Sequence, residues 1–356
     1  MVETTQTNDK DTKQQTLTIG FDPNDVAAWS DHLEKEGFAV LKGVLSKDDV
    51  DKSINHVFEW FEYQSADGKI KRDDMSTWTN TNLFPGRGRG FLTNKGGGQT
   101  EASWFIRSHP EVVKAFKNIW KTKDNPDPDL LTSMDTFICW RNWGSDKRGE
   151  ENWDPFVERL HCDQSPSRKK GKHCVQGMIP LYPVTEEIGG LQVVPKTNTD
   201  ENQEALVNRY GNTGDWLELS PNDELIGTGK LLIADPGDLI LWDSRTIHGG
   251  YVGQGPLPDE DRLLRLSMTV TMCPFEKWDK EKVPNLLEKR MWAVDKGCTT
   301  THWPITYEAH SGPAGKTYKR PDMTEDRLRL VRGPEPLLNW PTKDPLYLKD
   351  FEKPTA

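Results

Sequence analysis

The chain has 356 residues and a formal net charge of −10, and 34% of its residues are hydrophobic, including 14 tryptophans and 12 phenylalanines. This apolar content is enough for a buried core and excludes global disorder, whereas the acidic balance disfavours nucleic-acid binding, which needs clustered Lys and Arg. The five cysteines are scattered, which excludes a disulfide framework, and no apolar run approaches the roughly 20 residues of a membrane span.

The N-terminal part predicts a tail followed by a helix, a strand and a second helix. Residues 1–17 are polar, lack the apolar segment of a signal peptide, and are expected to be disordered. Residues 22–36 predict a helix that Gly37 closes, and residues 38–45 form a short β-prone run. Ser46 is a typical N-cap for the amphipathic helix that follows. With neither a signal peptide nor a membrane span, a cytoplasmic location is expected, and the oligomeric state stays open.

Two further segments come before the β-rich part of the chain. Residues 84–99 are rich in glycine and contain three basic side chains, which indicates a mobile loop, either a plain surface loop or a substrate lid. The loop lacks the spacing of a phosphate-binding Walker motif. Residues 109–121 predict a helix with Pro110 in its first turn.

From about residue 131 the pattern changes to short β-prone runs separated by Gly, Pro, Asn and Asp. Such spacing favours a sandwich or a barrel. The segment from about 275 to 356 is rich in Pro, Trp and Lys without clear periodicity, and it is expected to wrap the core irregularly. Since there is neither a repeat nor a linker, we expect one domain over residues 18–356. The β-prone runs are 131–141, 174–182, 191–194, 231–234, 238–243 and 263–272.

The strongest chemical signal is the pair His161 and Asp163. In an extended chain, residues two apart point to the same face, so an imidazole and a carboxylate would be aimed together while Cys162 faces away. A distant histidine would complete a facial triad that leaves three positions of an octahedral Fe(II) open, which suits oxygenase chemistry. The simpler alternative is a hydrogen-bonded surface pair.

His248 is the best third ligand among the eight histidines. It follows a strongly β-prone run, and the glycines directly after it would keep space open near a metal. His173 lies among lysines, which is typical of an exposed turn. A structural zinc site is an alternative, because His-Cys pairs occur at 161–162 and 173–174, but the usual short Cys-x-x-Cys spacing is absent.

A basic residue follows on the run 262–272. Arg265, Ser267 and Thr269 share one polar face of a strand that is otherwise apolar. An arginine there can form a bidentate pair with a carboxylate, and a hydroxyl two residues on can add a hydrogen bond. This arrangement suits the distal carboxylate of 2-oxoglutarate, with Arg262 as the alternative anchor.

With these residues in place, the chain resembles the phytanoyl-CoA dioxygenase family over roughly residues 30–273. The likeness implies a mainly β fold with α additions: a double-stranded β-helix, or jelly-roll, cupin-like core over about 131–273, flanked by helices. It also implies Fe(II), 2-oxoglutarate as co-substrate and O2. The matching segments, in the family's order, are 37–46, His161-Cys-Asp163, 175–181 with 189–195, 236–248 and Arg265.

The implied activity is hydroxylation of a small molecule with release of succinate and CO2. Halogenating relatives lose the carboxylate ligand, so the presence of Asp163 favours oxygenation. Two alternatives remain: an inert ligand-binding member of the same fold, and a zinc-dependent hydrolase.

The substrate itself is open at this point. Several upstream residues could line a pocket for an acidic or aromatic substrate, although packing or solvation is the better explanation for each of them taken singly. Arg245 precedes the distal histidine by three positions and either lies near the site or pairs with an acidic neighbour. The candidate pocket residues are Arg87, Arg89, Trp104, Arg107, Trp140, Arg141 and Trp143.

Overall fold

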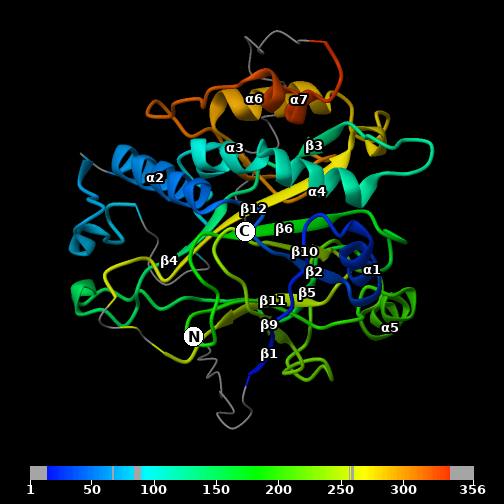
Figure 1. Cartoon of the computed structure of the whole chain (residues 1–356), viewed down its shortest axis with the longest axis horizontal. Coiled ribbons are helices and arrows are strands. Elements are labelled where there is room, and N and C mark those ends of the chain that lie inside the picture. Colours follow the sequence, from blue (N-terminus) through cyan, green and yellow to red (C-terminus); the bar gives the residue numbers. More distant parts are fainter. Residues whose placement is uncertain (1–13, 66–67, 84–89, 256, 258–259, 337–356) are drawn as a thin grey trace.

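The computed structural model describes residues 14–65, 68–83, 90–255, 257 and 260–336. Two β-sheets face each other, and helices cover the outer face of one of them (Figure 1). This is the predicted mainly β architecture with α additions, a cupin-like core flanked by helices.

The strands form two large sheets and one small hairpin. They are β1 (Gln15–Leu17), β2 (Phe38–Leu41), β3 (Leu130–Thr132), β4 (Phe137–Trp140), β5 (His161–Cys162), β6 (Val175–Pro180), β7 (Gly189–Val193), β8 (Leu217–Glu218), β9 (Lys230–Leu232), β10 (Leu239–Asp243), β11 (His248–Val252), β12 (Arg265–Pro274), β13 (Thr299–Thr300) and β14 (Ala309–Ser311). The first sheet has the order β1-β9-β7-β11-β5-β8, and the second has the order β2-β10-β6-β12-β3, with β4 also paired to β12.

Five of the seven described α-helices begin at a residue whose side chain caps the first turn. Ser46 and Asp49 form a reciprocal capping box at the start of the second helix, and Gly37 ends the first helix in the left-handed conformation. The helices are α1 (Val26–Glu36), α2 (Lys47–Gln64), α3 (Glu101–Arg107), α4 (Pro110–Trp120), α5 (Asp200–Tyr210), α6 (Leu286–Lys296) and α7 (Glu325–Arg332).

The second sheet is buried on both faces, and β2 shows how. Ala39 and Leu41 belong to the core between this sheet and the helices, whereas Phe38 and Val40 belong to the core between the two sheets. Since successive side chains of a strand point to opposite faces, a continuous apolar run is what a doubly covered strand requires. The neighbouring strand β10 is also a continuous apolar run, because it too is covered on both faces.

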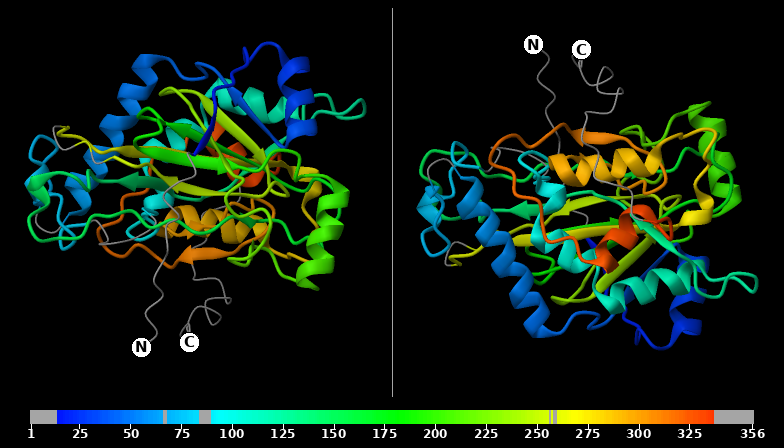
Figure 2. Two further views of the ribbon diagram at one scale, coloured as in Figure 1. Left: turned by 90° about the horizontal axis from the view of Figure 1, so that it is seen from below. Right: turned by 90° about the horizontal axis from the view of Figure 1, so that it is seen from above.

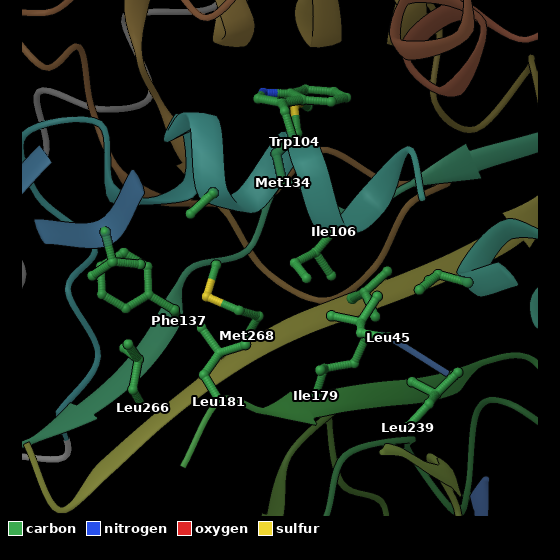
Figure 3. Close-up of a cluster of buried hydrophobic side chains, with 14 of the residues drawn as sticks. Leu45, Trp104, Ile106, Met134, Phe137, Ile179, Leu181, Leu239, Leu266 and Met268 are labelled. Carbon is green, nitrogen blue, oxygen red and sulfur yellow. The ribbon is translucent and has the colours of Figure 1, made fainter. Parts of the chain in front are cut away.

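The helix-facing core fixes the position of the second sheet. Figure 3 shows Trp104 and Ile106 of α3 above Met268 of β12 and Ile179 of β6. These side chains are between 0% and 1% exposed. Burying large apolar side chains stabilises the fold by about 1.5–3 kcal/mol each, so the helices hold the sheet that carries the polar face of β12.

Two predictions about the N-terminal part need correction. Residues 15–17, expected to be disordered, form β1 and pair in parallel with β9. Residues 1–13 lie outside the described part. The first helix begins at Val26 rather than at residue 22, because Asp25 is the residue whose side chain caps it.

The glycine-rich loop is also different from the prediction where the structure describes it. Gly97, Gly98 and Gln99 form a buried 3-10 turn instead of a mobile surface loop. The backbone amide of Gly98 donates to Thr299 Oγ1, and a Cβ at Gly97 would lie 1.6 Å from the carbonyl oxygen of Leu92. Close backbone approach therefore explains the glycines, whereas the part of the predicted lid at 84–89 lies outside the described residues.

The C-terminal segment is more regular than predicted. Instead of an irregular extension, residues 275–336 contain α6, α7 and the hairpin of β13 and β14. Figure 2 shows α6 and α1 towards opposite edges of the sheets, and side chains of both helices belong to the same apolar cluster. Arg290 of α6 is 1% exposed and donates to the carbonyl oxygens of Thr132, Pro304 and Val331, which ties this segment to β3 and α7. Residues 337–356 lie outside the described part.

The sequence predicted neither a membrane span nor a disulfide framework. Within the described ranges, no helix combines the length and apolarity needed to cross a membrane. The five cysteines are buried and unpaired.

Candidate functional site

Strand pairing brings His161 and His248 together. The two residues are direct partners in the antiparallel pair of β5 and β11, although 87 positions separate them in the sequence. Their ring centroids lie 4.5 Å apart. Asp163 follows β5 by one residue, so its side chain points to the same side as His161.

The three side chains offer one ligand atom each at a common point. Asp163 Oδ1 lies 3.7 Å from His161 Nε2, and Asp163 Oδ2 lies 3.2 Å from His248 Nε2. The three ligand atoms all lie within 4.8 Å of one another, and the residues are 4–8% exposed. Among the residues that the structure describes, this is the one group of three His, Cys, Asp or Glu side chains with such an arrangement.

Backbone carbonyls orient both imidazoles. His161 Nδ1 lies 2.8 Å from the carbonyl oxygen of Arg159, and His248 Nδ1 lies 2.8 Å from that of Thr246. A carbonyl can only accept, so each Nδ1 donates, and each Nε2 keeps a lone pair directed at the common point. This is the outer support that metal-binding histidines usually have.

Burial and charge set the protonation of the three groups. Burial and the neighbouring His248 lower the pKa of His161 to about 4, which keeps it neutral at pH 7. Burial alone would lower the pKa of His248, but the Asp163 carboxylate outweighs it and raises that pKa. Burial would raise the pKa of Asp163, yet His248 and His302 hold it well below its usual range. An ionised carboxylate and imidazole nitrogens are what a divalent metal needs.

Gln176 of β6 forms a hydrogen bond with the Asp163 carboxylate. Its Nε2 donates to Asp163 Oδ2 over 2.7 Å and to Ser244 Oγ over 3.2 Å. Gln176 was not among the predicted site residues. A polar side chain inside the apolar run 175–181 is the sequence signal that could have identified it.

Cys162 points away from this site, as the alternation predicts. Its Sγ donates to the carbonyl oxygen of Gln164, and its side chain belongs to a separate apolar cluster with Leu160 and Ile247. Burial raises the pKa of the Cys162 thiol well above its ordinary value. The His-Cys pair at 161–162 therefore does not form a joint zinc site.

A cavity of about 660 Å³ opens in front of the three ligand atoms. Both sheets contribute to it, through β4, β6 and β12 on one side and β5, β7 and β11 on the other. The C-terminal segment adds residues between β13 and β14. A cavity of this size holds a drug-sized molecule.

Arg265 lines this cavity at the start of β12. It is 5% exposed, its guanidinium carbon lies 4.5 Å from the ring centre of Trp140, and its Nη2 lies 3.4 Å from Met178 Sδ. Its Nε has no hydrogen-bond partner within the described residues. Burial lowers the pKa of Arg265 to about 10, so it stays charged at pH 7. A buried cation without a carboxylate is prepared for an anionic ligand.

Arg262 has different surroundings. It forms an ion pair with Glu260, lies over the ring of Tyr182, and does not line the cavity. The geometry therefore favours Arg265 of the two predicted alternatives. Ser267 shares the strand face of Arg265, and its Oγ is buried without a hydrogen-bond partner in the described structure. Ser267 does not line the cavity, whereas Thr269 and Thr271 on the same face do.

Most of the predicted substrate-pocket residues lie elsewhere. Of the described ones, Trp140 lines the cavity. Trp104 is fully buried and donates to Gln99, and Arg141 donates to the carbonyl oxygen of Trp78. Arg107 donates to the carbonyl oxygens of Gly98 and Asp135, and Trp143 packs against the core. Arg245 pairs with Asp243 over 2.8 Å, and Arg87 and Arg89 lie outside the described residues.

One wall of the cavity was not predicted from the sequence. This wall comes from Asp135 and from residues 301–310, a segment predicted to be irregular packing. His302 contributes to it, and His302 Nε2 is buried without a hydrogen-bond partner among the described residues. The other cavity residues of this segment are Thr301, Trp303, Glu308 and His310.

Known proteins resemble the chain in this same region. A family model described as phytanoyl-CoA dioxygenase matches residues 33–252, which is more than half of the chain. A protein of Aspergillus versicolor named Ava biosynthesis cluster protein O is 26% identical over 82% of this chain and 91% of its own length. A Dictyostelium discoideum protein named after phytanoyl-CoA dioxygenase is 22% identical over 67% of this chain and 75% of its own length.

Solved structures align less closely. The epimerase SnoN, in complex with Fe3+, alpha-ketoglutarate and nogalamycin RO, aligns with a TM-score of 0.45 and 13% identity, over 71% of this chain and 85% of that chain. A likeness of this size says nothing about which molecule the present cavity binds.

Proposed function

The chain belongs to the phytanoyl-CoA dioxygenase family of 2-oxoglutarate-dependent non-haem iron enzymes, and from this premise we propose that it hydroxylates a small molecule at a metal held by His161, Asp163 and His248. The family uses Fe(II), 2-oxoglutarate and O2. The observation that carries the proposal is the convergence of the three ligand atoms at the end of a cavity that also contains an unpaired arginine.

The donor set fits iron(II). Two imidazole nitrogens and one carboxylate oxygen give a facial triad, which leaves positions open for 2-oxoglutarate and O2. The carbonyl partners of both Nδ1 atoms and the amide of Gln176 hold the ligands in place without the metal. When bound, iron(II) supplies the redox chemistry that couples O2 to the oxidative decarboxylation of 2-oxoglutarate.

Arg265 is the proposed anchor of 2-oxoglutarate. Its buried guanidinium would form a charge-assisted pair with the distal carboxylate, and the free hydroxyl of Ser267 on the same strand face would add a hydrogen bond. The surrounding apolar residues exclude water from this end of the cavity, which strengthens the pair. Trp140 covers the guanidinium and limits its orientation.

In the proposed reaction, one atom of O2 is transferred to the substrate as a hydroxyl group, and the other enters succinate when 2-oxoglutarate loses CO2. The chain's own residues bind the reactants, orient them and keep water out. Asp163 occupies the third protein position of the triad, so no position is left for a halide, which favours hydroxylation over halogenation.

Measurement of succinate formation tests this proposal. Purified protein with Fe(II), 2-oxoglutarate and O2 is expected to form succinate and CO2, and to lose this activity when Zn(II) replaces Fe(II). An inert ligand-binding protein would bind 2-oxoglutarate without forming succinate. A zinc hydrolase would contain zinc on purification and would act without O2 or 2-oxoglutarate.

A further inference from the structure

The two ends of the cavity differ in chemistry. Arg265 is the cross-strand partner of Trp140 at one end of β4, whereas Asp135 precedes the other end of β4. Asp135 and Trp140 are five positions apart, which corresponds to roughly 16 Å in an extended chain, so Arg265 and Asp135 line different parts of the cavity wall. The proposed metal-binding residues lie on or next to the opposite sheet. In the proposed function, Arg265 rather than Asp135 binds 2-oxoglutarate.

Asp135 is a buried carboxylate with few partners. It is 8% exposed and lines the cavity, and the one hydrogen bond to its carboxylate comes from the backbone amide of Thr136, over 2.7 Å to Oδ1. No ion pair reaches Oδ2 from any described residue, because the nearby Arg107 donates to backbone carbonyl oxygens instead. Burial raises the pKa of Asp135, and His310, the Thr136 amide, His302 and Arg107 oppose this shift without outweighing it.

The carboxylates around the cavity differ in their ion pairs. A divalent metal, the Asp163 carboxylate, the Arg265 guanidinium and the 2-oxoglutarate dianion together carry no net charge. Asp215, another carboxylate on the cavity wall, is paired with Lys169 over 2.5 Å. Among the described residues, neither Asp135 nor the exposed Glu308 forms an ion pair, although the charge of the buried Arg107 acts on Asp135.

Aromatic side chains surround the same space. Four large hydrophobic side chains are exposed in the described part of the chain, and three of them line this cavity: Phe91, Phe156 and Trp216, which are 38–47% exposed. Exposed aromatic rings at a cavity mouth offer faces to a ligand rather than to the core. Rings combined with carboxylates are the surroundings that organic ammonium groups prefer.

From these observations we propose that the substrate carries a positively charged amine, which Asp135 binds, together with an apolar body that packs against the aromatic mouth. The inference rests on the proposed function and names the substrate class of the same cavity. The Nε2 atom of His302, which has no hydrogen-bond partner among the described residues, lies on the same cavity wall. Residues 301–310 lie beyond the part of the chain that matches the family model, whereas Asp135 and the three aromatic residues lie within it.

The proposal differs from one of the two expectations for the substrate, which was an acidic molecule. That expectation relied on basic residues, of which Arg107 and Arg141 donate to backbone carbonyl oxygens and do not line the cavity, whereas Arg87 and Arg89 lie outside the described residues. The aromatic expectation agrees with the rings at the mouth.

Three matched probes test the substrate class: 2-phenylethylamine, 2-phenylethanol and 3-phenylpropionate. Each is titrated calorimetrically, without O2, into protein loaded with Fe(II) and 2-oxoglutarate. We expect the amine to bind at least about tenfold more tightly than the alcohol or the acid, since a buried charged hydrogen bond discriminates to this extent. Equal or tighter binding of the alcohol or the acid would overturn the proposal.

Two variants locate the amine site. Asp135→Asn keeps the shape and removes the charge, so the amine should lose its roughly tenfold advantage. Asp215→Asn is the matched control, because Asp215 lines the same cavity but is paired with Lys169, and its loss should change amine binding less than about twofold. An unchanged amine preference in Asp135→Asn, or equal losses in both variants, would contradict the assignment.

A third variant covers the case in which Asp135→Asn does not fold. Glu308 is exposed, so Glu308→Gln should fold normally and weaken amine binding by roughly two- to threefold. No change in Glu308→Gln would then count against the proposal. Loading with Fe(II) and 2-oxoglutarate is measured first, so its failure would contradict the proposed function, whereas a missing amine preference on loaded protein would contradict only the substrate class.

Discussion

Paired strands place the proposed metal ligands, whereas segments outside the two large sheets place Asp135 and the cavity residues of the C-terminal segment. His161 and His248 are direct cross-strand partners, and Arg265 begins the longest strand. Asp135 lies in the connection before β4, and His302 lies between the two short strands of a hairpin. Hydrogen-bonded ladders fix side-chain positions to within the register of the sheet, while connections can vary without disturbing it.

The limit of the family model does not coincide with this difference. The family model ends at residue 252, so it includes the three proposed metal ligands and Asp135, and it excludes Arg265 and residues 301–310. The regular strands can keep one reaction while the segments that connect them select the substrate. The following predictions test whether the two regions behave so differently.

The largest effect is expected from His161→Ala. Loss of one of three protein ligands should prevent stable iron binding and lower succinate formation by at least about a thousandfold. The matched control is His173→Ala, since His173 lies in a lysine-rich turn and its Nε2 contacts the carbonyl oxygen of Lys170. Iron content and succinate release are measured for both variants. Equal activity in the two variants would rule out the proposed metal site.

The next largest effect is expected from Arg265→Gln. Loss of a buried charged partner should raise the KM for 2-oxoglutarate by roughly a hundredfold, with a smaller effect on iron binding. Arg262→Gln provides the control, because Arg262 pairs with Glu260 outside the cavity. The anchor would have to be reassigned if Arg262→Gln raised this KM more than Arg265→Gln.

A smaller effect is expected from Gln176→Met, which keeps the size and removes the amide. Asp163 would lose the donor at 2.7 Å, and iron affinity should fall by roughly 10- to 100-fold. The iron affinity of Gln176→Glu should be lower still, because this variant places a second carboxylate against Asp163. Equilibrium dialysis against Fe(II) without O2 measures these affinities. Unchanged affinity in both variants would show that Gln176 does not position the ligand.

The smallest effect concerns Trp216 at the cavity mouth. Trp216 has φ +63°, a left-handed conformation that costs a side chain about 1–2 kcal/mol, and its backbone amide donates to the carbonyl oxygen of Asp163. Trp216→Gly should therefore be more stable than Trp216→Ala by about 1 kcal/mol in urea unfolding. The reverse order would show that this conformation carries no strain.

The sequence was informative where a regular element determines the side chain's direction. Alternation placed His161 and Asp163 on one side and Cys162 on the other, and the polar face of β12 singled out Arg265 from its neighbours. The cupin-like fold followed from the strand pattern and the family resemblance together. Local spacing is sufficient in these cases because the period of a strand is fixed.

The sequence was not informative about places where segments distant along the chain come into contact. Gln176 became a site residue only because the second sheet brings β6 beside Asp163, and His302 only because the C-terminal segment returns to the cavity. The buried turn at 97–99 depends on contacts with Leu92 and Thr299, which no local pattern shows. Such contacts depend on tertiary packing rather than on local propensity.

The most direct test of the central claim is a titration of 2-oxoglutarate into Fe(II)-loaded protein without O2, followed by visible absorption. The account predicts one 2-oxoglutarate per chain, with a metal-to-ligand absorption that Zn(II) does not produce and that His161→Ala abolishes. An Fe(II)-loaded protein whose absorption does not change with 2-oxoglutarate, or a His161→Ala variant that responds like the wild type, would contradict it.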